Sequence, residues 1–159
     1  MKNNYLQTCC FTGHRHLTWI EKIKLKSKLK HTIKSLIFMG YKYFGVGGAI
    51  GFDTLAEKTI IKLRKRYPHI RLILVIPFSS QAEQWSEKDK KTYVKIKTNA
   101  DKIVYISEQY TKDCYQQRNR HLVDYSNLCV CYLKKARSGT QSTVNYARRK
   151  GLKVINLAP

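Results

Sequence analysis

Short apolar runs alternate with longer amphipathic segments along the chain. Most of the runs are rich in β-branched or aromatic residues, which is typical of strands that are buried on both faces of a sheet. They occupy residues 5–11, 43–46, 72–77, 102–106, 128–133 and 154–157. Each run is therefore predicted to form one strand.

The segments between these runs carry apolar residues at the three-and-four spacing of a helix. In residues 19–39, Leu25, Leu29 and Ile33 fall on one face, and lysines fall on another. Helices are predicted for residues 19–39, 52–67, 113–125 and 140–150. Residues 78–99 are less regular and are expected to contain one further helix, next to the sheet edge where open α/β sheets bind ligands.

The alternation of strands and helices defines the expected fold. Repeated strand–helix–strand units form right-handed crossovers and a mostly parallel sheet. We therefore expect an α/β fold, with one Rossmann-like three-layer domain over residues 1–159. The chain shows no internal repeat, low-complexity tract or linker.

Composition adds a strong charge asymmetry to this picture. The 159 residues are 43% hydrophobic and 26% charged, which is globular composition, but 31 Lys and Arg against 10 Asp and Glu give a net charge of +21. Such a charge favours anionic partners without choosing between nucleic acid, nucleotide and acidic membrane. The five cysteines lack C-x-x-C spacing, and no apolar run is long enough to span a bilayer. These features predict a reduced, cytoplasmic protein with no metal site and no membrane association.

A glycine-rich turn follows the second predicted strand at residues 45–53. Gly47, Gly48 and Gly51 would let the backbone turn tightly and approach a ligand, and the N–H groups of the next helix attract anions. The spacing is not the G-x-G-x-x-G of dinucleotide folds, which disfavours a standard NAD site. Asp53 either caps this helix or accepts a hydrogen bond from a ribose or base.

Two further strand-to-helix turns would meet at the same sheet edge. The turn after the fifth strand offers a glycine and three hydroxyls, which serve either as an ordinary helix cap or as a grip on phosphate. Its candidate residues are Ser138, Gly139, Thr140 and Thr143. The turn after the first strand adds Gly13, His14 and Arg15.

The helix predicted at residues 113–125 carries Arg118 and Asn119. Arg118 is suited to a bidentate contact with phosphate. The simpler interpretation is that it lies on a solvent-exposed face of the helix. His14 is a candidate general base, but a single His in a turn more often serves as a hydrogen-bonding residue. No Ser-His-Asp order, P-loop or paired carboxylates are apparent, and no catalytic residue is assigned.

Together these segments resemble the SLOG superfamily, a Rossmann-like group that includes the DNA-processing protein DprA and the LOG phosphoribohydrolases. Within it, the chain looks most similar to the YpsA-like, DUF1273-type branch. The resemblance covers about residues 6 to 157. It is carried by Cys10-Phe11-Thr12-Gly13-His14-Arg15, by residues 47–56, by Ile76-Pro77-Phe78 with Gln81 and Trp85, by Arg118-Asn119 with Val123-Asp124, and by residues 138–140 with Thr143.

The resemblance implies a pocket for a phosphorylated nucleoside-type molecule, such as a nucleotide, a nucleotide sugar or an ADP-ribose-like ligand. It implies a role as a ligand sensor or regulator, with no resident cofactor. The family's glycine motifs map onto Gly47, Gly48, Gly51 and Asp53, and onto Gly139, Thr140 and Thr143. Gln81 and Trp85 are candidate lid residues.

One position departs from the LOG pattern P-G-G-x-G-T-x-x-E. Thr143 stands where the catalytic Glu would be. A hydroxyl can neither activate water nor stabilise an oxocarbenium-like centre as a carboxylate does. The departure therefore favours binding over phosphoribohydrolase activity.

Two other functions remain open at this stage. An N-glycosidase could use Glu57 or Asp53 in place of the missing Glu. A DprA-like nucleic-acid binder would use surface lysines, with a weak, nonspecific and salt-sensitive attraction. A homodimer is a further option that the residues do not decide.

Overall fold

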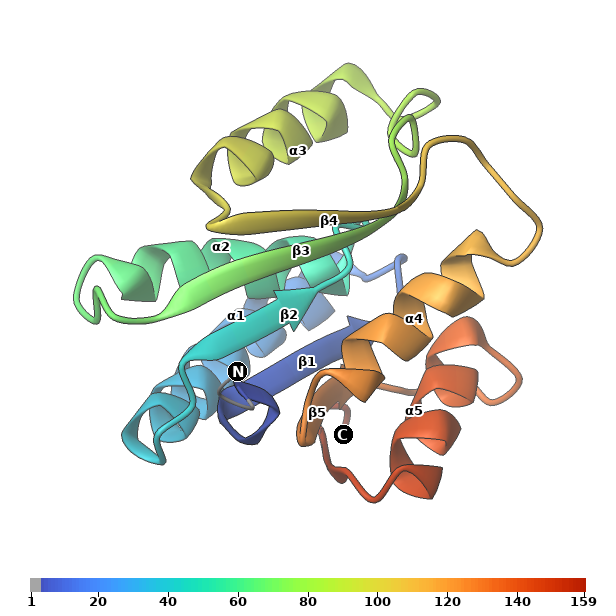
Figure 1. Ribbon diagram of the computed structural model, residues 1–159. Helices are drawn as coiled ribbons and strands as arrows, with labels where there is room; N and C mark the ends of the chain where they lie inside the picture. Colours follow the sequence, from blue (N-terminus) through green and yellow to red (C-terminus); the bar gives the residue numbers. More distant parts are fainter. Residues whose placement is uncertain (1–3) are drawn as a thin grey trace.

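The computed structural model describes residues 4–159, which form a parallel sheet with helices on both faces (Figure 1). The six-stranded sheet has the order β4-β3-β2-β1-β5-β6, and every neighbouring pair is parallel. The strands are β1 (Thr8–Gly13), β2 (Tyr43–Val46), β3 (Arg71–Phe78), β4 (Lys102–Ser107), β5 (Leu128–Tyr132) and β6 (Lys153–Asn156). The predicted α/β, Rossmann-like fold with a parallel sheet is confirmed.

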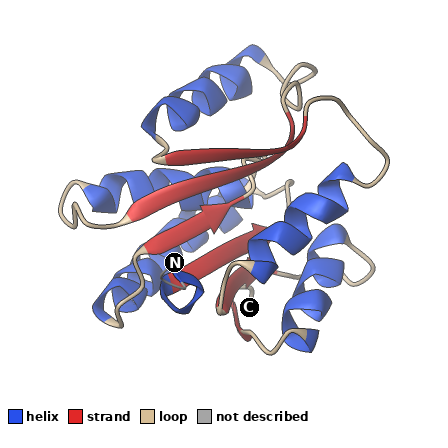
Figure 2. Ribbon diagram, in the orientation of Figure 1, coloured by secondary structure: helices blue, strands red, loops and turns tan. Residues whose placement is uncertain are grey.

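The helices divide between the two faces of the sheet (Figure 2). One face carries α1 (Trp19–Phe38), α2 (Phe52–Arg64) and α3 (Glu87–Asn99), and the other carries α4 (Cys114–Asp124) and α5 (Gly139–Arg149). The four helices predicted from periodicity are present. The less regular segment contains α3, which begins after Ser86 because that side chain accepts a hydrogen bond from the Asp89 amide.

The predicted start of the first strand is wrong by three residues. Asn4–Gln7 form a 3-10 helix, and the Thr8 hydroxyl donates a hydrogen bond of 2.7 Å to the Asn4 carbonyl. The register explains why β1 starts at Thr8, because β2 begins at its pairing partner, Tyr43. Residues before Thr8 therefore have no ladder partner on that side.

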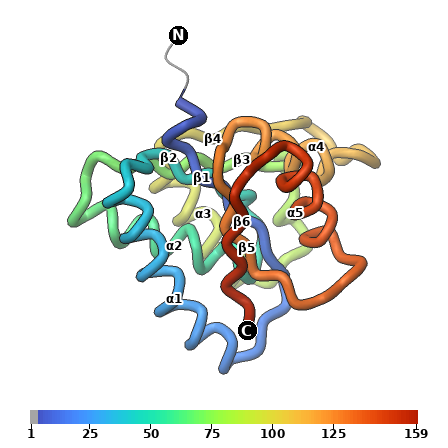
Figure 3. Tube along the Cα trace, turned by 90° about the horizontal axis from the view of Figure 1, so that it is seen from below, coloured from blue at the N-terminus to red at the C-terminus, as the bar shows by residue number. Residues whose placement is uncertain are grey.

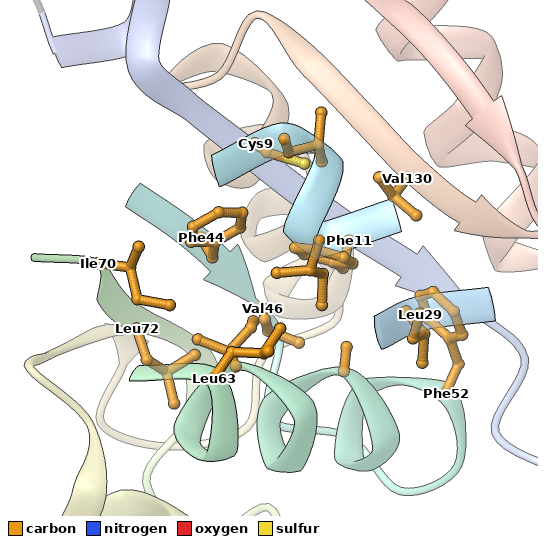
Figure 4. Packing of buried hydrophobic residues seen from close by; sticks show 14 of the residues in the cluster. Cys9, Phe11, Leu29, Phe44, Val46, Phe52, Leu63, Ile70, Leu72 and Val130 are labelled. Carbon is orange, nitrogen blue, oxygen red and sulfur yellow. The ribbon is translucent and has the colours of Figure 1, made fainter. Parts of the chain in front are cut away.

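The core has a different composition on each side of the sheet. Between the sheet and α1 and α2, the ring of Phe11 packs with its centroid 6.3 Å from that of Phe44 and 6.4 Å from that of Phe52 (Figure 4). The opposite side holds smaller residues, including Cys129 and Cys131 on one strand face. All five cysteines are free and buried, where they serve as small core residues.

The strand order creates a crevice at the carboxyl end of the sheet. From β1 the chain proceeds outward to β2 on one side, whereas β5 pairs with β1 on the other side. Figure 3 shows α1 and α2 together along one side of the molecule and α5 on the other. This reversal is the topological switch point at which open α/β sheets bind ligands. None of the helices within residues 4–159 is both long and apolar enough to cross a bilayer.

Candidate functional site

A cavity of about 300 Å³ opens at this switch point, between β1, α4 and the start of α5. It is lined by most of the site residues expected from the sequence. These are Gly13, His14, Arg15, Asp53, Arg118, Asn119, Ser138, Gly139 and Thr140. The structure thus brings three separate strand-to-helix turns and one helix to a common site.

The remaining glycines of the turn after β2 lie behind the cavity and shape its wall. Gly51 has a φ of +80°, and a Cβ there would collide with the backbone carbonyl of Arg15. A Cβ on Gly47 would lie 2.5 Å from the Arg118 Nη1 and 2.9 Å from the Asp53 Oδ2. Neither glycine lines the cavity. The absence of a Cβ at each position instead lets Arg15, Asp53 and Arg118 pack closely against the backbone of the turn.

Buried polar side chains hold the turn after β2 in place. The Gly48 amide donates a hydrogen bond of 3.0 Å to the Glu57 Oε1, and the Ala49 amide donates one of 3.2 Å to the Asp53 Oδ2. Arg118 donates from Nη1 to the Gly47 carbonyl. Arg118 Nε also donates a hydrogen bond of 2.7 Å to the side chain of the adjacent asparagine.

Burial and mutual charge set the ionisation of this cluster. Burial raises the pKa of Asp53, and the positive charge of Arg118 opposes the rise. Burial also raises the pKa of Glu57 well above its ordinary 4.5, and the negative charge of Asp53 raises it further. The neutral form of Glu57 is therefore favoured, whereas the guanidinium of Arg118 favours the charged form of Asp53.

The structure corrects two sequence readings of these carboxyl groups. Asp53 is not the helix cap, because the N-cap position is Gly51 and Asp53 lies in the first turn of α2. A pair of buried carboxyl groups also exists, since Asp53 and Glu57 are one helical turn apart and both buried. The i, i+4 spacing was visible in the sequence, but the inward orientation of both side chains was not.

His14 joins two of the turns. Its Nε2 accepts hydrogen bonds of 2.9 Å and 3.1 Å from the amides of Lys134 and Lys135. Burial lowers the pKa of His14, and the positive charge of Lys135 lowers it further, so the neutral ring is favoured. Because the Nε2 lone pair already accepts these hydrogen bonds, the geometry favours a hydrogen-bonding role for His14 over a role as general base.

The start of α5 presents an open helix N-terminus to the cavity. Ser138 caps the helix by accepting a hydrogen bond of 3.1 Å from the Gln141 amide, as the capping alternative predicted. A Cβ on Gly139 would meet no atom within 4 Å, so this glycine leaves open space for a ligand. Thr143 donates a hydrogen bond of 3.0 Å to the Gly139 carbonyl and faces a neighbouring cavity instead.

Tyr115 is a lining residue that sequence reasoning missed. The guanidinium carbon of Arg15 lies 5.0 Å from the centroid of its ring, and that of Arg118 lies 5.9 Å away. Two cations and an aromatic face therefore share one wall of the cavity. No local sequence signal marks Tyr115, because Arg15 reaches it from a distant turn.

The two candidate lid residues are not in the lining. The buried Gln81 Nε2 donates hydrogen bonds of 3.1 Å to the Gly48 carbonyl and of 3.1 Å to the Tyr93 hydroxyl. Trp85 packs edge-on against Tyr93, with ring centroids 5.1 Å apart. Gln81 thus holds the glycine turn directly, and Trp85 contacts the other hydrogen-bond partner of Gln81, Tyr93. Across residues 4–159, no group of three His, Cys, Asp or Glu side chains is placed to hold a metal ion.

This fold and site define a doubly wound α/β protein with a polar cavity at its switch point. The model of the YspA SLOG family matches residues 10–154, so the chain belongs to this SLOG family. It is 33% identical over 140 residues to the uncharacterized SPbeta prophage-derived protein YoqJ of Bacillus subtilis, covering 80% of this chain and 82% of YoqJ. It is also 33% identical to a UPF0398 protein of Halalkalibacterium halodurans, over 76% of this chain and 62% of that relative.

Solved structures support the fold. DNA processing protein A of Streptococcus pneumoniae has a TM-score of 0.67 and 18% identity, over 96% of this chain and 50% of that protein. The Helicobacter pylori protein of the same name, described in a structure concerning its single-stranded DNA binding mode, has a TM-score of 0.66 and 18% identity. It is covered over 65% of its length. The chain therefore corresponds to part of these proteins.

Proposed function

We propose that the cavity binds a phosphorylated nucleoside-type molecule, such as ADP-ribose or a related nucleotide, and that the protein acts as a cytoplasmic ligand sensor or regulator. The observation that carries this proposal is the open N-terminus of α5 at Ser138 and Gly139, in the same cavity as Arg15 and Arg118. A helix N-terminus with nearby guanidinium groups is a favourable environment for phosphate.

The other lining groups suit the remainder of such a ligand. Tyr115 offers an aromatic face for a base, and Asp53 offers a carboxylate for ribose hydroxyls. A second cavity of about 200 Å³ between α4 and α5 shares Tyr115, Asn119 and Gly139 with the first. This continuity favours a ligand longer than a single nucleotide.

The same geometry favours binding over hydrolysis. Thr143, which stands in place of the LOG Glu, donates its hydroxyl proton to a carbonyl of its own helix. Among the described residues that line the main cavity, Asp53 alone carries a carboxylate. We expect no base release from nucleoside monophosphates or NAD on long incubation. Release that is abolished by Asp53→Asn would instead establish an N-glycosidase.

The binding proposal is tested by thermal melting with AMP, ADP, NAD and ADP-ribose. A ligand that binds only the folded state stabilises it by about 2.7 kcal/mol at a concentration of 100 times Kd. The informative variant is Gly139→Val, because its side chain enters open space and would occupy the ligand position without displacing protein atoms. The matched control is Thr98→Val on the exposed surface of α3.

We expect ADP-ribose or a related nucleotide to raise the Tm of the wild type and of Thr98→Val. Gly139→Val should retain the Tm of the free protein but lose the ligand-induced rise. If no nucleotide at millimolar concentration changes the wild-type Tm, the pocket proposal fails. It also fails if Gly139→Val binds as well as the wild type does.

A further inference from the structure

A larger cavity, of about 470 Å³, lies between α1 and α2, outside the switch-point site. All of its ionisable lining residues are cations. They are Lys26, Lys30 and Lys34 on α1, with Lys58, Lys62 and Arg66 on or just after α2. We call this feature the cationic groove.

The six cations form two rows. Within each row the residues are four positions apart, so those within α1 and α2 lie on one side of their helix, and Arg66 follows the end of α2. A four-residue step rises about 6 Å along an α-helix, so the three lysines of α1 extend for about 12 Å. Both helices connect parallel strands of one sheet and lie together in Figure 3, so the rows run in the same direction along the groove.

The cations of the groove form no ion pair with a carboxylate within residues 4–159. The ion pairs within residues 4–159 are Arg64 with Asp101, Lys90 with Glu87, and Lys134 with Glu21. None of these involves a groove cation. The acidic residues of α2, Asp53 and Glu57, are both buried; Asp53 lines the switch-point cavity and Glu57 accepts a hydrogen bond from the Gly48 amide. The like charges therefore repel one another until an external polyanion neutralises them.

We propose that the cationic groove binds the phosphate backbone of a single nucleic-acid strand, without reading its sequence. Two parallel rows of cations along a concave track complement a linear chain of negative charges. The floor is aliphatic, with Leu55 and Leu63, so the groove offers charge contacts and no platform for stacked bases. This second site does not depend on the ligand proposed for the switch point.

The charge rows fit a strand better than a membrane surface. A membrane-bound amphipathic helix inserts an exposed apolar face into the bilayer and carries its cations on the polar face. Here Leu63 is buried in the groove floor. The exposed Trp19 and Ile23 lie on α1 outside the groove lining. Vesicle binding therefore serves as the competing outcome of the test.

The test uses fluorescence anisotropy of a labelled oligothymidine of about 20 nucleotides, titrated at several salt concentrations. The groove variant is Lys30→Gln/Lys58→Gln/Lys62→Gln, at three exposed positions. The matched control is Lys88→Gln/Lys91→Gln/Lys95→Gln, also at exposed positions and on one helix, α3. Both variants remove three positive charges from the same protein, so they differ only in where the charge is lost.

We expect the groove variant to weaken oligonucleotide binding at least tenfold and to reduce the slope of log K against log salt by about 2. The control should change Kd by less than about threefold, and Gly139→Val should bind the strand normally. Equal losses in the two lysine variants would overturn the proposal, because they would indicate diffuse attraction. So would the absence of binding to the wild type, or a groove variant that loses only its binding to phosphatidylserine vesicles.

Discussion

Two ionisable side chains, Glu57 and Arg118, are almost fully removed from water, with 1% and 5% of their surface exposed. An isolated buried charge costs several kcal/mol, so each must be neutralised or satisfied. Arg118 is satisfied by the Gly47 carbonyl, by Asn119 and by the negative charge of Asp53. Glu57 is instead favoured in its neutral form, and it accepts the Gly48 amide. The cluster thus orders the turn that forms the back of the site.

This ionisation makes stability depend on pH through Glu57. Its pKa is raised in the folded state, so its contribution is fully present below about pH 4.5 and is lost as the pH rises toward the folded-state pKa. Glu57→Gln keeps an acceptor for the Gly48 amide but does not titrate. We expect the variant to lose less free energy of unfolding than the wild type between pH 5 and pH 8, as measured by urea denaturation.

The control for this measurement is Glu83→Gln, which removes a carboxylate at an exposed position. It should follow the pH profile of the wild type. If Glu57→Gln shows the same pH dependence of the free energy of unfolding as the wild type, Glu57 is ionised in the folded protein, contrary to the neutral form inferred above.

Gly51 allows a second prediction at this scale. Gly51 and Gly40 both have positive φ, at +80° and +98°, but only a Cβ on Gly51 would collide with protein, at the Arg15 carbonyl. An Ala in left-handed backbone costs about 1–2 kcal/mol. Gly40→Ala should show that loss alone, and Gly51→Ala a larger one, in urea unfolding. Equal losses would show that the contact between the turns after β1 and β2 is not close.

Among the elements, α5 supplies both stability and the proposed phosphate site at its N-terminus. Ser138 accepts the Gln141 amide and donates a hydrogen bond of 2.8 Å to the Lys135 carbonyl. Ser and Asp are comparable caps, but Asp adds a negative charge that the helix dipole favours. A substitution that keeps the cap but adds a negative charge therefore separates the effect of Ser138 on stability from its effect on phosphate binding.

Ser138→Asp should keep the free energy of unfolding within about 1 kcal/mol of the wild type, because the cap is retained. It should weaken binding of ADP-ribose at least tenfold, since the added carboxylate repels phosphate. Titration calorimetry with melting of the free protein measures both effects. Stronger binding of ADP-ribose would exclude phosphate from the start of α5.

Local patterns were sufficient to predict the helices and the parallel sheet, because periodicity acts over a few positions. For Ser138 they left a helix cap and a phosphate contact as alternatives, and the structure shows the cap. They were insufficient for the start of β1, which depends on where β2 supplies a partner. They also missed Tyr115, whose contact with Arg15 joins residues far apart in the sequence. The assignment of Gln81 and Trp85 as lid residues stays a prediction, and neither side chain lines the cavity in this structure.

At the scale of the whole molecule, the net charge of +21 has two separate consequences. A few guanidinium groups lie in the switch-point cavity, whereas two lysine-rich rows line the groove between α1 and α2. We infer that a small phosphorylated ligand and a nucleic-acid strand use different surfaces. On this account, neither should displace the other by occupying its site.

The central claim is that the switch-point cavity binds a phosphorylated nucleoside-type molecule. The most direct measurement is a calorimetric titration of ADP-ribose into the wild type and into Gly139→Val. The account predicts saturable binding to the wild type, with one ligand per chain, and its loss in Gly139→Val at an unchanged Tm of the free protein. Equal binding by the two proteins would contradict it, because the ligand would then lie elsewhere on the molecule.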